Sequence, residues 1–132
     1  RSRFPKPCVH ESSRMLVSWQ RTERDLQDIL DAIARIERFV GSRSEADFIA
    51  DPMCIDACLL NLERVGEAAK RLPDSVKDSE PDIPWREIRA MRNIIAHQYW
   101  KTDLSIVWEV IDQELEALRD AVERLAAITR EM

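Results

Sequence analysis

Apolar residues recur at steps of three and four along most of this chain, a spacing that places them on one side of a helix. The first such stripe belongs to a helix predicted from about Ser18 to Val40. It consists of Leu26, Ile29, Leu30, Ile33, Ile36 and Val40. Gly41 follows as a C-terminal stop. With only two glycines and one tyrosine in 132 residues, an all-β fold is disfavoured.

A second helix begins at Asp51 and Pro52, a typical N-cap and first-position pair, and is predicted to run to about Arg71. Its apolar stripe comprises Ile55, Cys58, Leu59, Leu62, Val65, Ala69 and Leu72. Pro73 ends it. The connectors on either side, residues 41–51 and 73–83, are each predicted to hold no more than one helical turn.

Two further helices complete the predicted domain. Pro84 opens a third helix that is predicted to reach about Tyr99. Thr102 or Asp103 caps a fourth, which has heptad-like spacing at Leu104, Trp108, Ile111, Leu115, Leu118, Val122 and Leu125. We therefore predict an all-α fold: an antiparallel bundle of four, or up to five, helices in a single domain over residues 15–132.

Residues 1–14 contain two prolines and no apolar periodicity, so we interpret them as a disordered leader or an expression remnant. No uncharged run approaches the roughly 18 apolar residues needed to cross a bilayer, and no signal-peptide core is present. These features predict a soluble, cytoplasmic protein that does not associate with membranes.

Three cysteines, Cys8, Cys54 and Cys58, are an odd number for a disulfide framework. Cys54 and Cys58 share a predicted helix face and could ligate a metal, but neither His10 nor His97 has ligand spacing to them. We interpret the two as small buried apolar residues. The sequence predicts no metal site and no cofactor, since a Gly-rich phosphate loop is also absent.

The net charge of −5 argues against a general nucleic-acid coat protein. The charge is unevenly distributed, however. Residues 84–101 carry four basic side chains against one acid, a local charge of +3. Residues 103–132 carry eight acids against three arginines, a local charge of −5. The predicted third helix could therefore hold an anion locally.

This third helix has two faces when its residues are placed at 100° steps. Its apolar stripe, suited to the bundle core, is Ile88, Met91, Ile94 and Ile95. The remaining face is polar and basic and includes Arg86, Arg89, Arg92, Asn93, His97 and Tyr99, together with the small Ala96. Tyr99 falls about 20° from Arg92 on this wheel.

This combination of residues suits RNA cleavage without a metal. Histidine, which ordinarily titrates near neutrality, could remove the proton from an attacking 2′-hydroxyl, so His97 is a candidate general acid or base. A planar guanidinium could stabilise the phosphoryl charge, so Arg92 is its candidate partner. Asn93 could orient the imidazole or hold a phosphate oxygen, with Arg86 and Arg89 as candidate substrate-binding residues.

Simpler interpretations stay open beside this one. A basic helix face is most often solvated surface, and Arg86 and Arg89 could pair with acids of the last helix. Tyr99 and the nearby tryptophans could serve only as packing at the rim.

The stretch RNIIAHQY, with Arg92, Asn93, His97 and Tyr99, resembles the R-x-x-x-x-H-x-Y signature of HepT-like toxins, a branch of the HEPN superfamily. LERVGEAAKRLP, PWREIRAMRN and KTDLSIVWEVIDQELEAL resemble the segments around that signature. The resemblance covers about residues 16–125 and leaves the leader outside.

The resemblance implies a metal-independent endoribonuclease toxin with a HEPN-like helical bundle, acting on tRNA or mRNA in a type II- or VII-like toxin-antitoxin pair. It assigns catalysis to Arg92 and His97, in a cleft shared by a homodimer. The implied partner is a minimal nucleotidyltransferase antitoxin, which would silence the toxin by AMPylation of Tyr99. An alternative is a non-catalytic HEPN-like subunit that binds nucleotides or docks a nucleotidyltransferase. The presence of both Arg92 and His97 favours the enzyme.

Overall fold

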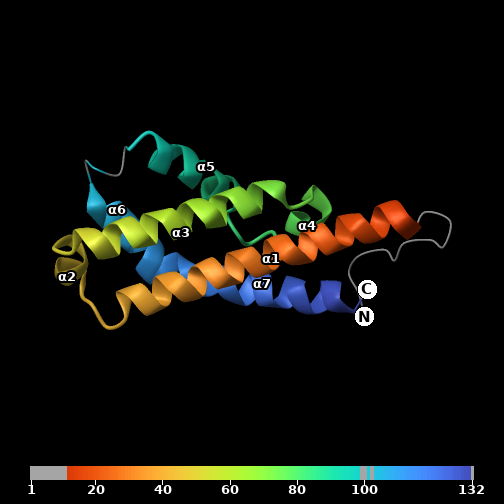
Figure 1. Cartoon of the computed structure of the whole chain (residues 1–132), viewed down its shortest axis with the longest axis horizontal. Coiled ribbons are helices and arrows are strands. Elements are labelled where there is room, and N and C mark those ends of the chain that lie inside the picture. Colours follow the sequence, from red (N-terminus) through yellow and green to blue (C-terminus); the bar gives the residue numbers. More distant parts are fainter. Residues whose placement is uncertain (1–11, 99–100, 102, 132) are drawn as a thin grey trace.

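The computed structural model describes residues 12–98, 101 and 103–131 of the chain, and all regular structure in this part is helical. Three long helices form the body (Figure 1): α1 (Ser12–Val40), α3 (Pro52–Arg71) and α7 (Leu115–Arg130). α3 and α7 both run antiparallel to α1 and contact it. The predicted all-α bundle is confirmed, with α5 (Trp85–Ala96) as a shorter helix that packs on α3.

The second predicted helix agrees with the structure at both ends. Asp51 is the N-cap of α3, and its side chain accepts a hydrogen bond from the Cys54 backbone N–H at 3.1 Å. The helix ends at Arg71, as predicted. The connectors on either side hold the short helices α2 (Glu45–Ile49) and α4 (Asp74–Asp78). Local signals, a cap at one end and a proline at the other, are sufficient to predict where this helix begins and ends.

Two helix boundaries differ from the prediction. α1 begins at Ser12, six residues before the predicted start, so residues 12–14 of the expected leader are helical. The predicted fourth helix is divided into α6 (Leu104–Glu109), a π-helical turn η3 (Val110–Glu114) and α7, and the chain bends between α6 and α7 (Figure 1). Asp103 caps α6 by accepting from the Ser105 N–H at 3.0 Å. Thr102, the other predicted cap, lies outside the described residues.

The core lies between α1, α3 and α7, and it contains most of the stripes predicted for the first two helices. Every member of the α3 stripe is buried, and the α1 stripe is buried except for the half-buried Leu30. Phe48 of α2 closes one end, with its ring centroid 5.4 Å from that of Trp108. Cys54 and Cys58 are buried free thiols, as predicted. No helix in the described part is long and apolar enough to span a membrane.

Candidate active site

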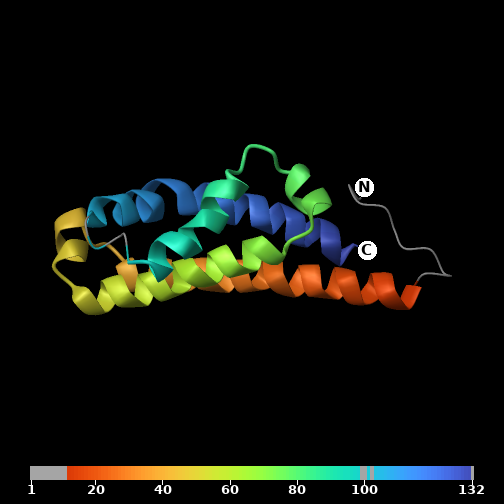
Figure 2. The same ribbon diagram turned by 90° about the horizontal axis from the view of Figure 1, so that it is seen from above.

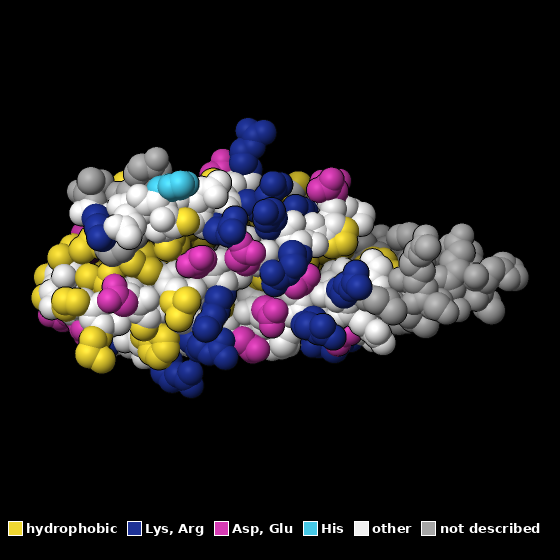
Figure 3. Space-filling model, turned by 45° about the horizontal axis from the view of Figure 1, so that its top comes forward, with side chains coloured by type: hydrophobic (Ala, Val, Ile, Leu, Met, Phe, Trp, Pro, Cys, Tyr) yellow, Lys and Arg dark blue, Asp and Glu magenta, His cyan; other side chains and the backbone are white. Residues whose placement is uncertain are grey.

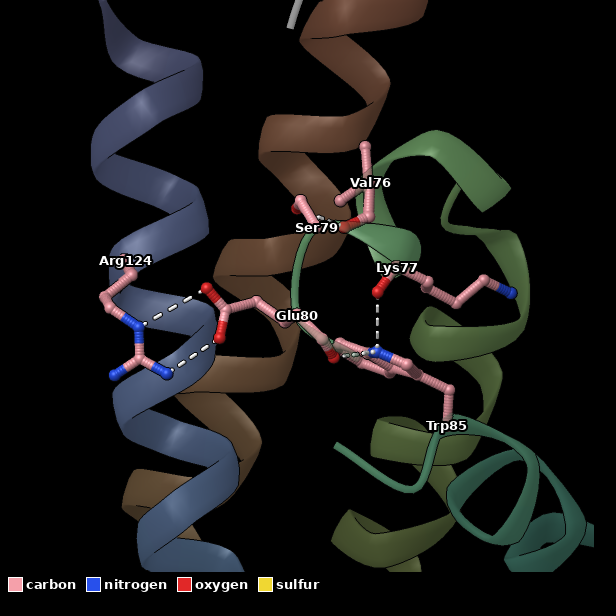
Figure 4. A network of polar contacts seen from close by, with 6 residues as sticks. All are labelled: Val76, Lys77, Ser79, Glu80, Trp85 and Arg124. Carbon is pink, nitrogen blue, oxygen red and sulfur yellow. Dashed lines mark hydrogen bonds and ion pairs between the residues drawn. The ribbon is translucent and has the colours of Figure 1, made fainter. Parts of the chain in front are cut away.

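The beginning of α5 is held by one buried side chain. The indole Nε1 of Trp85, the first residue of the helix, donates to the backbone carbonyls of Lys77 and Glu80, both at 3.1 Å (Figure 4). The Glu80 carboxylate in turn accepts from Arg124 of α7 at 2.8 Å. This network ties the segment between α4 and α5 to α7, so the first turn of α5 has a fixed position in the bundle (Figure 2).

The middle of α5 lies unusually close to α3. A Cβ atom built on Gly66 of α3 would lie 3.2 Å from the Ile88 carbonyl oxygen and 3.3 Å from the Arg92 Cβ. Side chains at such distances force neighbouring atoms apart, and here those atoms belong to the α5 backbone and its first side-chain carbon. The absence of a side chain at Gly66 therefore allows this close approach, which brings Arg92 directly over α3.

Arg92 forms an ion pair with the residue that follows this glycine. Its guanidinium Nε contacts Oε1 of Glu67. Both side chains are partly exposed, Arg92 at 41% and Glu67 at 35%. Arg92 thus lies at the border between the apolar stripe of α5 and its polar face, in contact with Gly66 and Glu67 of α3.

His97 stands at the C-terminal end of α5. It is the C-cap residue, and its backbone N–H donates to the Asn93 carbonyl oxygen at 3.0 Å. The side chain is exposed. Gln98 then adopts a left-handed backbone conformation with φ of 61°, which turns the chain out of the helical path.

This helix end corrects the prediction of a third helix reaching about Tyr99. α5 stops at Ala96, because the turn at Gln98 breaks the helical repeat. The predicted 20° separation between Tyr99 and Arg92 assumed a continuous helix, and the helix is not continuous beyond Ala96. Tyr99 itself lies outside the described residues.

The other candidate residues of α5 are exposed. Arg86, Arg89 and Asn93 all face solvent. Figure 3 shows a face on which basic side chains gather near a histidine, with acidic side chains between and below them. Among the described residues, no ion pair joins Arg86 or Arg89 to an acid of α7, so that alternative for these two arginines is wrong. They remain available for an anionic ligand.

The apolar stripe of α5 was expected in the core, but it borders an open groove. Ile88, Met91 and Ile95 are half-buried, and Ile94 is 41% exposed. They line a groove of about 320 Å³ whose other wall is formed by α6, η3 and the start of α7. The core prediction therefore holds in part: Ile88, Met91 and Ile95 pack against the core while bordering the groove. It was wrong for Ile94, which lies on the side of α5 that is turned away from α3.

Metal-ligating side chains are dispersed in the part of the chain that the structure describes. No three His, Cys, Asp or Glu side chains there are close enough together to hold a metal ion. Burial, with a smaller contribution from neighbouring Cys54, raises the pKa of the Cys58 thiol to about 12, so this thiol stays protonated near neutral pH.

The prediction from sequence missed Glu67, which lies 25 positions before Arg92 and on a different helix. One signal could have indicated it. Gly66 interrupts an otherwise regular helical pattern, and a glycine inside a helix often marks a close approach of another element. The residue beside such a glycine is a natural candidate for contact with that element.

Comparisons with known proteins agree with the motif. The family described as "Ribonuclease HepT-like" matches residues 29–125. A protein of Thermococcus cleftensis named "Probable ribonuclease HepT" is 35% identical over 107 residues, which are 80% of this chain and 97% of that protein. A protein of Caldanaerobacter subterraneus with a provisional RNase name is 37% identical over 90 residues, 68% of this chain and 80% of that protein.

A third relative has a second activity in its name. This protein of Methanocaldococcus jannaschii is named as a gamma-glutamylcyclotransferase and, provisionally, an RNase. It is 33% identical over 97 residues, which are 74% of this chain but only 44% of that protein. No solved structure matches the chain significantly. The family match covers well over half of the chain, including α3, α5 and the R-x-x-x-x-H-x-Y motif, and the chain therefore belongs to the HepT-like ribonuclease family.

Proposed function

We propose that this chain is a metal-independent endoribonuclease in which His97 moves protons and Arg92 stabilises phosphoryl charge. The observation that carries the proposal is the pairing of these two groups on one helix. Arg92 is fixed against α3 through Glu67, and His97 is exposed at the end of the same helix, five positions later. We propose that one substrate phosphate contacts both the permanent cation and the proton-transfer group.

The proposed reaction needs only these two kinds of group. The 2′-hydroxyl of the substrate loses a proton to a general base and attacks the adjacent phosphorus, forming a 2′,3′-cyclic phosphate. The bond from phosphorus to the 5′-oxygen breaks, and that oxygen takes up a proton. Negative charge grows on the two non-bridging oxygens, where a guanidinium can donate two hydrogen bonds. Histidine titrates near neutral pH and can serve at either proton-transfer step.

Substrate would bind along the exposed part of α5. Arg86 and Arg89 face solvent and could contact phosphates on either side of the cleaved bond. Asn93, one turn before His97, could orient the imidazole or hold a phosphate oxygen. Because binding depends on this local charge and opposes a net charge of −5, affinity for RNA should fall steeply as salt rises.

Purified protein should cleave single-stranded RNA or tRNA in the presence of EDTA and leave a 2′,3′-cyclic phosphate. His97→Ala and Arg92→Ala should each lower kcat by roughly 10²- to 10⁴-fold. Arg24→Ala, at an exposed position on α1, is the matched control and should cleave normally. Loss of cleavage on chelation would contradict the metal-independent mechanism. Binding of RNA without cleavage would favour the alternative function, a non-catalytic nucleotide-binding or docking subunit.

The proposed active form is a homodimer in which the two Arg92 and His97 faces line one cleft. An exposed histidine on a single helix cannot enclose RNA, whereas two such faces related by a two-fold axis form a groove. Ile94 and Ile106, 41% and 57% exposed at the groove beside α5, offer apolar surface for such contact. Light scattering should give twice the chain mass of 15.4 kDa. A monomer at micromolar concentration would exclude this assembly.

We further propose that the nuclease is a toxin silenced by a minimal nucleotidyltransferase antitoxin, which AMPylates Tyr99. The support for this step is the family motif, in which the tyrosine follows the histidine by two positions. Each added AMP would bring a phosphate charge and bulk close to His97. Intact-mass spectrometry after co-expression should show AMP adducts on the parent protein and none on Tyr99→Phe, which should stay an active nuclease. Adducts that persist in Tyr99→Phe would exclude this acceptor.

A further inference from the structure

The contact between Glu67 and Arg92 is part of a chain of charged groups that crosses three helices. The Glu67 Oε1 atom that contacts Arg92 is shut off from solvent, and it makes no hydrogen bond within the described residues besides this ion-pair contact. Oε2 lies 3.9 Å from a terminal nitrogen of Arg71. Arg71 is itself anchored to α1, where its Nε donates to Asp25 at 2.9 Å. The Glu67 carboxylate is therefore held from both sides.

The atoms involved determine which part of Arg92 stays free. A guanidinium has one donor at Nε and four on its two terminal nitrogens. Glu67 contacts Nε, and no other acid pairs with Arg92 in the described part of the chain. The terminal nitrogens, which form the fork that suits two oxygens of a phosphate, are thus left for a ligand.

We infer that Glu67 is a positioning residue for Arg92, a conclusion that rests on the proposed nuclease function. Its carboxylate holds the guanidinium at Nε and leaves the two terminal nitrogens for a substrate phosphate. A long arginine side chain otherwise samples many rotamers, and ordering it during the reaction would be costly. Glu67 supplies that order before substrate binds, and Gly66 provides the close helix contact that brings the two residues together.

An opposite role is chemically reasonable and gives an opposite result. A carboxylate beside the catalytic arginine could compete with phosphate and restrain the enzyme, in which case its removal would raise activity. A positioning role predicts a loss of activity when the carboxylate is removed. The two roles therefore differ in the sign of the effect of Glu67→Ala.

Three variants at this position separate orientation from charge. Glu67→Ala should lower kcat on single-stranded RNA by about 10- to 100-fold, while KM changes only a few-fold. Glu67→Gln keeps an oxygen that can accept from Nε, so its kcat should stay within about threefold of the parent. Glu67→Asp keeps the charge, but its side chain is one methylene shorter. Its kcat should therefore lie between those of Glu67→Ala and Glu67→Gln. Glu63→Ala, one turn earlier on α3, is the matched control and should leave kcat unchanged.

The outcomes that would overturn the inference are specific. A rise in kcat for Glu67→Ala would establish competition with phosphate in place of positioning. An Ala variant with the parent's kcat would remove Glu67 from the reaction. Equal losses in Glu67→Gln and Glu67→Ala would show that charge, not orientation, is what matters. If Glu67→Ala fails to fold, the comparison of Asp and Gln variants with the parent still decides between charge and orientation.

A second measurement does not depend on nuclease activity. In the NMR spectrum of the free protein, the Arg92 Nε–H signal, assigned by its loss in Arg92→Lys, should exchange slowly with water. Glu67→Ala should speed this exchange at least tenfold, and Glu63→Ala should not. Rapid exchange in the parent would refute the positioning contact. Slow exchange in a parent protein that does not cleave RNA would leave the contact intact and refute only the proposed nuclease function.

Discussion

Replacement of Gly66 by alanine tests whether the close contact of α3 with α5 matters for both stability and catalysis. The added methyl would lie 3.2 Å from the Ile88 carbonyl oxygen and 3.3 Å from the Arg92 Cβ, so α5 must move away by a few tenths of an ångström. Overpacking of this kind costs about 1–3 kcal/mol. Alanine recovers about 0.5–1 kcal/mol because it favours helix more than glycine does. We expect a net loss of about 1–2 kcal/mol.

For a chain of 132 residues, each kcal/mol corresponds to a Tm change of about 3–5 °C, so Gly66→Ala should melt about 3–10 °C below the parent. The same substitution should also lower kcat, because the movement of α5 displaces Arg92. A misplacement of 1 Å costs about 100-fold in rate, so a shift of about 0.3–0.5 Å should lower kcat about 4- to 10-fold. Calorimetry and RNA cleavage measure the two effects.

A bulkier residue provides the control for this interpretation. Gly66→Val should lower both Tm and kcat further than Gly66→Ala, because its branched side chain reaches more of the α5 backbone. An alanine variant that melts higher than the parent and cleaves at the parent's rate would refute the reasoning, since helix propensity alone would then account for the change.

Three other predictions concern stability and can be checked by urea titration. Trp85→Phe removes the indole donor to the Lys77 and Glu80 carbonyls and should cost about 1–3 kcal/mol. Asp51→Ala removes the cap of α3 and should cost about 1 kcal/mol, whereas Asp51→Asn should cost little. The buried Cys58 thiol has its pKa raised from 9.0 to about 12, so above pH 9 the folded state retains a proton that the unfolded chain releases. The unfolding free energy should therefore fall as pH rises through this range, and less steeply in Cys58→Ala.

The helices of the body could be predicted from sequence because their signals are local. Asp51 and Pro52 define the start of α3, and the apolar spacing around Val65 defines its buried side. The end of α5 had no such signal, since Gln98 takes up a left-handed conformation that is usual for glycine. The π-helical turn in 110–114 also lies within unbroken heptad-like spacing.

The candidate site was predictable only in part for a related reason. The residue types of Arg92 and His97 and their common helix follow from the motif, and the exposure of His97 was expected from the helix wheel. The Glu67 partner depends on how two helices pack, which no periodicity within one helix determines. For the same reason, the groove along Ile94 could not be foreseen, because an apolar stripe does not show whether another element covers it.

α5 is anchored much more firmly at its first turn than at its far end. Its first turn is fixed through Trp85, its middle rests on Gly66, and its far end at His97 is exposed. At a rise of 1.5 Å per residue, His97 lies about 18 Å from Trp85, so a tilt of about 5° at the anchored end would move it by about 1.5 Å. Arg92, seven positions from Trp85, would move by about 0.9 Å in the same tilt. Such a tilt would also pull Arg92 away from Glu67 and open the close contact at Gly66, so the packing of α3 on α5 and the position of His97 change together.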